Sequence, residues 1–453
     1  MILTARYIIP IEGQPLENGA LVVRDELILD IGPSEEMLEK YPHDEVKDFG
    51  RAAIMPGLVD LHTHLEYSAL RGIVHDVPYA EWLALEHKKA DLMTYDDRLN
   101  SARIGCMEMI QGGVTTVAEF SSSGASLEAI KEMGLRASVY RSVGALEKSA
   151  VGTAVDSAVS DIRTWRENSD DSLIHIGIAP KALHACHPEL FSQVNAIAEK
   201  DNLPVAMHIA GSSEEYRFIR YGTTPLSVRG IEGTDENLTD RPMHLPAGVT
   251  PVNYALNWEA FDSRNVLAVH CVHVDAEYIR QLQHNDVAIA ISTRANAQLG
   301  MGLAPLPEYI RAGLRVGLGT DSPAAIDTAD MFVEMRLGML LHRAVNSSEF
   351  LTAETMLYLA TLGGARALRM DDKIGSLKKG KRADIIVVDL SSSRQTPLVD
   401  PVMAVVTSAS ATDVRFTMVN GKVLYNDETF LTGIDGEEVT QRVIETRYRL
   451  RDE

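Results

Sequence analysis

Short apolar runs alternate with amphipathic, helix-like stretches through the middle of the chain. Near-continuous apolar strands between helices are typical of a parallel sheet that is buried on both faces. Eight such units predict an α/β fold of the TIM type, a (β/α)8 barrel with insertions. The eight runs are IMPGLVDLH, VTTVAEF, RASVYRSV, LIHIGIAP, PVAMHIA, VLAVHCV, VAIAIS and RVGLGTD.

Both ends of the chain have a different pattern. Residues 1–55 alternate apolar and polar positions between turn signals, which predicts short antiparallel strands. Residues 371–435 have the same texture and contain the hairpin signal VNGKV. We therefore expect a small β-sandwich domain formed by both termini, 1–55 plus 371–435. The barrel would occupy 56–370, and a charged C-terminal helix would follow over 436–453.

Composition and charge exclude several classes of partner. The chain has 453 residues and a formal net charge of −21, which argues against nucleic acid or an anionic membrane as a partner. Cys106, Cys186 and Cys271 are too few for a disulfide framework and favour the reducing cytoplasm. No apolar run approaches the ~20 residues of a membrane helix, and no signal peptide is evident. We expect a cytoplasmic protein that acts on a small molecule.

Several ionisable residues stand where the predicted barrel strands end, and those ends meet on one rim of a barrel. Imidazole and carboxylate ligands suit Zn²⁺, with Fe²⁺ as the alternative. Such a metal lowers the pKa of bound water to ~7, which suits hydrolysis at neutral pH. Histidines elsewhere, such as His87 and His175, are expected to be surface or packing residues. The strand-end residues are His62, His64, Lys181, His208, His270 and Asp321.

Five stretches carry a resemblance to a known family. They are MPGLVDLHTHLEYSALRG, QGGVTTVAEF, VHCVHVDAEYI, ANAQLGMGLAPLPEYIRAGLRVGLGTDS and KIGSLKKGKRADIIVVD. Together they resemble the amidohydrolase superfamily, and most closely its branch of methylthioadenosine/S-adenosylhomocysteine deaminases, aminodeoxyfutalosine deaminases and triazine hydrolases. The resemblance implies a metal-dependent hydrolase of a C–N bond in a small heterocycle, with deamination of a purine nucleoside-like ring favoured. Its relatives are often dimers or larger, so a homo-oligomer is expected by analogy.

The resemblance also implies roles for individual residues. Asp321 would accept a proton from the metal-activated water, and His270 would polarise the leaving or carbonyl-like group. The ligands of one divalent metal would be His62, His64, His208 and Asp321. Trp82 and Asp91 have the spacing of a substrate-facing Trp and acid in the relatives' first long insertion. The implied substrate-binding residues are Trp82, Asp91, Lys181 and Asn296.

Three places depart from the deaminase pattern. One is the run DSPAAIDTAD after the eighth strand, where the relatives usually have an Asn within SN. The deaminases have the motif H-x-x-E after the fifth strand, where the Glu carries protons, but this chain has His208 followed by Gly211. A positioned general acid is typically worth 10²–10⁴-fold in rate, so its loss is serious. The relatives also have a His where this chain has Lys181. Acids that could replace the missing Glu are Glu66, Glu119, Glu214 and Glu215.

These departures leave three interpretations. In the favoured one, the protein is a one-metal deaminase in which another acid replaces the Glu. In the second, Lys181 is carbamylated and bridges two metals, with His270 as a further ligand, as in branches that hydrolyse cyclic amides or lactones. In the third, Gly211 marks a homologue with impaired catalysis that binds a metal or ligand. A metal count and the chemical state of Lys181 would separate the first two.

Overall fold

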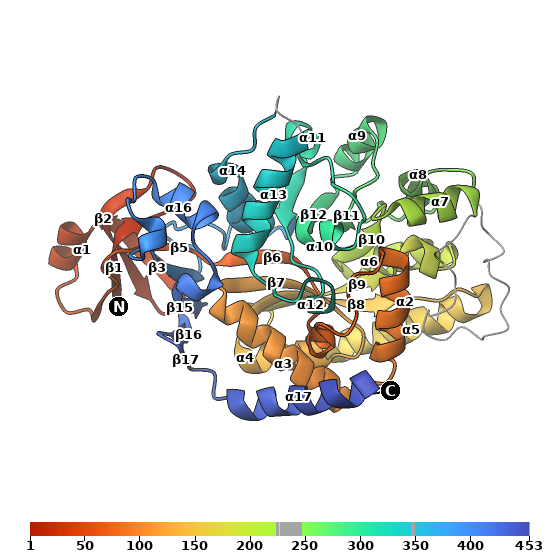
Figure 1. The fold of residues 1–453 in the computed structure, drawn as a ribbon, viewed down its shortest axis with the longest axis horizontal. Helices are drawn as coiled ribbons and strands as arrows, with labels where there is room; N and C mark the ends of the chain where they lie inside the picture. The colour runs from red at the N-terminus through yellow and green to blue at the C-terminus, as the bar shows by residue number, and fades with distance from the viewer. Residues whose placement is uncertain (223–225, 227–246, 346–348, 453) are drawn as a thin grey trace.

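The computed structural model of the chain describes residues 1–222, 226, 247–345 and 349–452. Its centre is an eight-stranded parallel sheet that curls into a barrel, with helices around it (Figure 1). Neighbouring strands pair in chain order, so the predicted α/β barrel is confirmed. The strands are β6 (Leu58–Thr63), β7 (Val114–Ser121), β8 (Arg136–Val143), β9 (Ile174–Pro180), β10 (Val205–Ile209), β11 (Val266–His270), β12 (Ala288–Ile291) and β13 (Arg315–Leu318).

The barrel strands are buried on both faces, as their apolar runs require. All eight residues of β7 are buried, and so are all five of β11. The connecting helices cover the outer face with one apolar stripe each. Helix α4 (Ala125–Met133) begins after Gly124 and ends at Gly134, and both glycines have positive φ angles of 84° and 80°. Only glycine adopts this backbone at little cost, so the two residues set the length of the helix.

The barrel closes between β6 and β13 with little strand pairing. The two strands share one isolated bridge, between Thr63 and Asp321, and the Asp321 N–H donates to the His62 carbonyl at 2.7 Å. The buried carboxylate of Asp60 adds to this closure. It accepts the N–H of His62 at 3.1 Å, and the N–H and hydroxyl of Thr320 at 2.9 and 2.6 Å. Three polar contacts therefore hold the point where two candidate metal ligands meet.

A second, nine-stranded sheet combines strands from the first and the last part of the chain, which confirms the predicted β-structure built from both ends. One expectation needs correction, because β1 pairs in parallel with β4 and β5 as well as antiparallel with β2. Helix α1 (Ser34–Lys40) returns the chain, which allows the parallel pairing. The exact domain boundaries stay a prediction. The strands are β1 (Ile2–Ile8), β2 (Leu16–Arg24), β3 (Leu27–Pro33), β4 (Val46–Asp48), β5 (Ala52–Pro56), β14 (Ile385–Asp389), β15 (Val414–Val419), β16 (Lys422–Asn426) and β17 (Thr429–Phe430).

The run IMPGLVDLH, expected to be one strand, belongs to both sheets. Its first half is the end of β5, its second half is β6, and Gly57 lies between them. A Cβ atom on Gly57 would lie 2.0 Å from the Thr115 hydroxyl oxygen. The close approach of the two segments therefore requires glycine where the chain passes from one sheet to the other.

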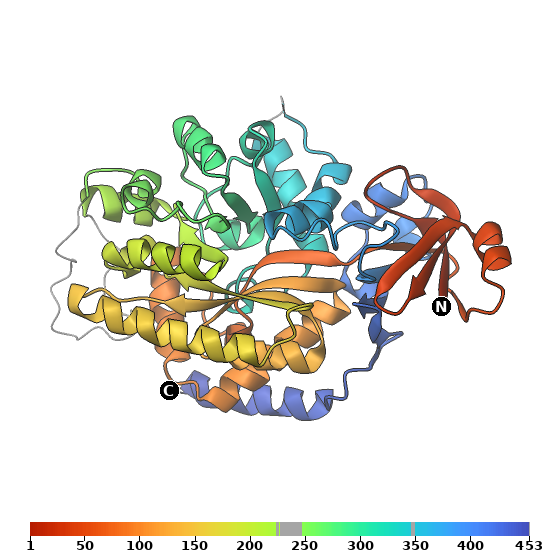
Figure 2. The same cartoon turned by 180° about the vertical axis from the view of Figure 1, so that it is seen from behind.

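Two helices outside the barrel repeat support the rim where the strands end. Helix α2 (Tyr79–Ala90) lies in the first insertion, and α17 (Gly436–Asp452) runs along α3 (Tyr95–Gln111) toward α2 (Figures 1 and 2). The Lys89 ammonium donates to the Leu450 carbonyl at 2.7 Å, and Leu450 is fully buried. No helix in the described part of the chain is long and apolar enough to cross a membrane.

Candidate active site

Three histidines and one aspartate converge at the carboxyl ends of the strands. Nε2 of His62 lies 3.0 Å from Nε2 of His64 and 3.0 Å from Nε2 of His208. The His64 and His208 nitrogens are 3.3 Å apart. Oδ1 of Asp321 lies 3.5 Å from Nε2 of His62 and 3.9 Å from Nε2 of His64. Nitrogen and carboxylate donors that converge from three strand ends could hold a divalent metal ion.

Burial sets the protonation of this cluster. It lowers the pKa of His64 to about 3 and holds the pKa values of His62 and His208 well below the usual value. The rings are therefore neutral near pH 7, and neutral imidazole is the form that binds a metal. Burial raises the pKa of Asp321 to about 7.

A hydrogen bond to Ser292, on the side of the ring away from the other histidines, orients His62. Its Nδ1 lies 3.0 Å from the hydroxyl of Ser292, which leaves Nε2 facing the cluster. Hydrogen bonds of this kind fix the tautomer and the direction of a ligating histidine. Both residues are fully buried, so bulk solvent does not compete for this hydrogen bond.

His270, the last residue of β11, faces Asp321. Its Nε2 lies 4.0 Å from Oδ2 of Asp321, and its Nδ1 lies 2.9 Å from Oδ1 of Asn296. An amide oxygen only accepts hydrogen bonds, so Nδ1 carries the proton and Nε2 is free of one in the neutral ring. Burial lowers the pKa of His270 to about 4, which favours this neutral form.

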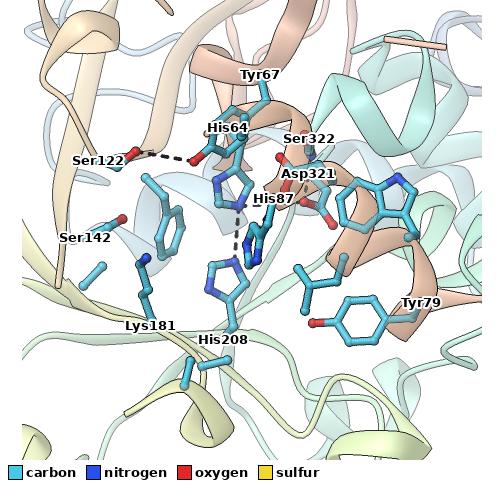
Figure 3. A pocket seen from close by; sticks show the side chains of 18 of the residues that line it. His64, Tyr67, Tyr79, His87, Ser122, Ser142, Lys181, His208, Asp321 and Ser322 are labelled. Atoms are coloured by element: carbon cyan, nitrogen blue, oxygen red, sulfur yellow. Dashed lines mark hydrogen bonds and ion pairs between the residues drawn. The ribbon is translucent and has the colours of Figure 1, made fainter. Parts of the chain in front are cut away.

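A pocket opens over the cluster. His64, His208 and Asp321 line it together with Lys181, and aromatic side chains form much of its wall. Figure 3 shows His64 and His208 pointing toward one another, between Lys181 and Asp321 in this view. The aromatic residues of the wall are Tyr67, Tyr79, Trp82 and Phe120. A flat ring could stack on such a wall above the metal ligands.

Of the four predicted substrate-binding residues, three line the pocket and one, Asn296, does not. Trp82 is buried in the pocket wall on α2, and Lys181, which directly follows β9, lines the pocket and is half-buried. Asp91, which directly follows the last residue of α2, is exposed and also lines the pocket. Asn296 is buried behind His270 and bonds to it. Asn296 therefore orients His270, and its contact with substrate stays a prediction.

Sequence reasoning missed part of the pocket wall. His87, expected to be a surface or packing residue, lines the pocket, as does the buried carboxyl of Glu86. Oε2 of Glu86 lies 3.8 Å from Nε2 of His87. The spacing of Trp82 and Glu86, one helical turn, was the available signal, because residues four apart share a helix face.

The chain matches the model of the amidohydrolase family over residues 53–424, and residues 19–43 match a bacterial imidazolonepropionase-like composite domain. Among curated proteins it is similar to a 5-methylthioadenosine/S-adenosylhomocysteine deaminase of Moorella thermoacetica. The two are 30% identical over 98% of this chain and 97% of the relative. A protein of the same name from Pelotomaculum thermopropionicum is 31% identical, over 96% of this chain and 94% of the relative.

Two solved structures share the fold. An adenosine deaminase from Xanthomonas campestris with bound zinc has a TM-score of 0.85 at 25% identity, covering 100% of this chain and 98% of that one. A zinc complex of atrazine chlorohydrolase from Arthrobacter aurescens has a TM-score of 0.83 at 23% identity, covering 98% of this chain and 99% of that one. These similarities extend over both sheets and are not limited to the barrel.

Proposed function

The chain belongs to the amidohydrolase family, and we propose that it is a metal-dependent deaminase of a small aromatic heterocycle, with an aminopurine nucleoside as the favoured class of substrate. The observation that carries this proposal is the convergence of His62, His64, His208 and Asp321 on one centre beneath an aromatic pocket. The curated relatives named as nucleoside deaminases and the zinc in the similar structures support it.

The four converging side chains would hold one divalent ion, and zinc fits them best because imidazole nitrogens dominate the set. When bound, such an ion lowers the pKa of bound water to ~7 and so supplies a nucleophile at neutral pH. Asp321 stands ready to take a proton, since its Oδ1 faces the histidines and its Oδ2 faces His270. Nε2 of His270 is an acceptor in the neutral ring and becomes a donor toward substrate once it is protonated.

We propose one metal in preference to two. In the two-metal interpretation, carbamylated Lys181 would bridge two ions, with His270 as a further ligand. The position of Nε2 of His208, within 3.3 Å of both His62 and His64, supports a single ion shared by these three histidines. We therefore assign Lys181 to substrate binding, where its ammonium group would meet a polar substituent of the ring.

We also propose a location and an assembly state for the protein. The net charge of −21 fits a small-molecule enzyme better than a nucleic-acid or membrane-surface protein. The three free, buried cysteines fit a reducing compartment, so we propose the cytoplasm. A homo-oligomer is proposed by analogy with the family.

The test is ammonia release by the zinc-loaded protein from adenosine, methylthioadenosine and S-adenosylhomocysteine, with cyclic amides and lactones as the comparison panel. We expect ammonia from at least one nucleoside, one metal per chain, and no effect of added bicarbonate. His208→Ala should lose the metal, whereas His175→Ala, at the start of β9 and the opposite end of the barrel, should keep it. Lactone or amide hydrolysis that needs bicarbonate and Lys181 would contradict the proposal.

A further inference from the structure

The position where the deaminases carry their catalytic Glu is tightly packed in this chain. A Cβ atom on Gly211 would lie 3.0 Å from the terminal methyl of Met301 and 3.3 Å from Cδ2 of His270. Met301 is buried, so its methyl would have to shift to admit a side chain at 211. An acid that serves this site must therefore come from another element.

Three buried acids near the site are already engaged in the framework. Oε2 of Glu215 accepts the N–H of Gly211 at 2.9 Å, and Glu119 accepts the Thr63 hydroxyl at 2.6 Å. Glu66 accepts the hydroxyl of Ser121 at 2.6 Å. None of these three carboxyls is among the described residues that line the pocket. Their hydrogen bonds hold the segments around the candidate metal ligands.

Glu86 meets the requirements that those acids fail. It is 4% exposed and lines the same pocket as His64, Lys181 and Asp321. Burial raises the pKa of Glu86 to about 8, so its carboxyl group carries a proton at neutral pH. The charged and titratable groups facing it are His87 and Asp91 of the same helix, Arg98 of α3, Lys181 after β9, Asp321 after β13, and the tyrosines Tyr67 and Tyr79.

We propose that Glu86, with His87 beside it, is the acid that protonates the substrate ring in this chain, in the role that Gly211 cannot fill. The inference rests on the proposed deaminase function. It moves the proton donor from the end of β10 to α2, which forms part of the pocket wall.

The protons balance in two steps. First, the Glu86 carboxyl gives its proton to the ring nitrogen beside the attacked carbon, water loses one proton to Asp321, and a C–O bond forms. Second, the proton held by Asp321 passes to the amino group, the C–N bond breaks and ammonia leaves. The remaining hydroxyl proton returns to Glu86 as the C=O bond forms. The sum is one water consumed, one ammonia released and a ring that has gained N–H and C=O.

The kinetic test compares Glu86→Gln with Glu215→Gln, its matched control. Both acids are buried, but only Glu86 lines the pocket, and a glutamine at 215 can still accept the Gly211 N–H. We expect Glu86→Gln to lower kcat by roughly 10²–10⁴-fold with unchanged zinc content, the range for a lost general acid. The wild-type rate should fall as pH rises through about 8, where Glu86 ionises, and Glu86→Gln should lack this fall. Equal losses in both variants, or full activity in Glu86→Gln, would overturn the assignment.

A second readout does not depend on turnover. Infrared spectra of the zinc-loaded protein at neutral pH should contain a carboxylic-acid C=O band that is present in Glu215→Gln and absent in Glu86→Gln. An unchanged band in Glu86→Gln would refute the inference even if the enzyme deaminates nucleosides. Absence of ammonia from the wild type, with the band assigned to Glu86, would instead refute the proposed substrate class.

Discussion

Gly211 and Met301 occupy complementary space, and this pairing predicts the outcome of a single substitution. Gly211→Glu would force its Cβ against the Met301 methyl at 3.0 Å. Overpacking of this kind typically costs about 1–3 kcal/mol, so we expect that loss in the free energy of unfolding by urea. Met301→Ser in the same chain should recover most of it. Gly152→Glu is the control, because a Cβ there meets nothing within 4 Å, and it should leave stability unchanged or raise it.

The raised pKa of Glu86 should also make the free energy of unfolding depend on pH. Its folded pKa of about 8 lies above the ordinary glutamate value of 4.5, so between these two pH values the folded state holds a proton that the unfolded state has lost. The free energy of unfolding therefore falls as pH rises through this window, by up to about 1.4 kcal/mol per pH unit. Urea unfolding across the window should show a shallower fall in Glu86→Gln than in the wild type. Identical slopes would mean that Glu86 is ionised in the folded protein.

At the scale of elements, the sequence predicts strands better than it predicts the placement of helices. The apolar runs located all eight barrel strands because a strand buried on both faces must be continuously apolar. Once the strands were located, the residues at their carboxyl ends, such as His208, could be predicted to meet on one rim. The direction of α2 could not be predicted, because a helix outside the barrel repeat is oriented by tertiary contacts such as that of Lys89 with Leu450. Glu86 and His87 were missed for this reason, and Asp91 lies at the exposed end of the same helix.

The closure of the barrel between β6 and β13 depends on Asp60 more than on strand pairing. Asp60→Ala would leave the buried N–H groups of His62 and Thr320 without their acceptor. Each buried donor left unsatisfied costs about 1–3 kcal/mol, so we expect a marked drop in the urea midpoint together with weaker zinc binding. Asp48→Ala, which removes a 2.9 Å bond to Thr4 in the terminal sheet, should leave zinc binding unchanged. Normal zinc affinity in Asp60→Ala would show that the ligands are positioned by other contacts.

At the scale of the whole molecule, one buried ion pair links the two sheets. Arg136 begins β8 of the barrel, and its guanidinium donates to both oxygens of Asp384, at 2.7 and 3.1 Å, just before β14 of the terminal sheet. The two side chains are only 3% and 2% exposed. Asp384 also accepts the N–H of Asn420 at 2.8 Å, so the pair holds the β15–β16 turn as well. The similarity to a solved structure covers both sheets, which fits two sheets that form one compact unit.

Removing one partner of this pair should destabilise the protein more than removing both. Asp384→Leu leaves the Arg136 charge buried without a counter-ion, which typically costs about 3–5 kcal/mol, whereas replacing both by apolar residues is often nearly neutral. We therefore expect Asp384→Leu with Arg136→Met to unfold at a higher urea concentration than Asp384→Leu alone. The exposed pair Arg415 and Asp427, 2.9 Å apart at 40% and 45% exposure, is the control and should contribute at most about 1 kcal/mol. A double variant no more stable than the single one would mean that Arg136 is stabilised chiefly by its bond to the Ser172 carbonyl at 2.6 Å, and that the two sheets are held together by apolar packing alone.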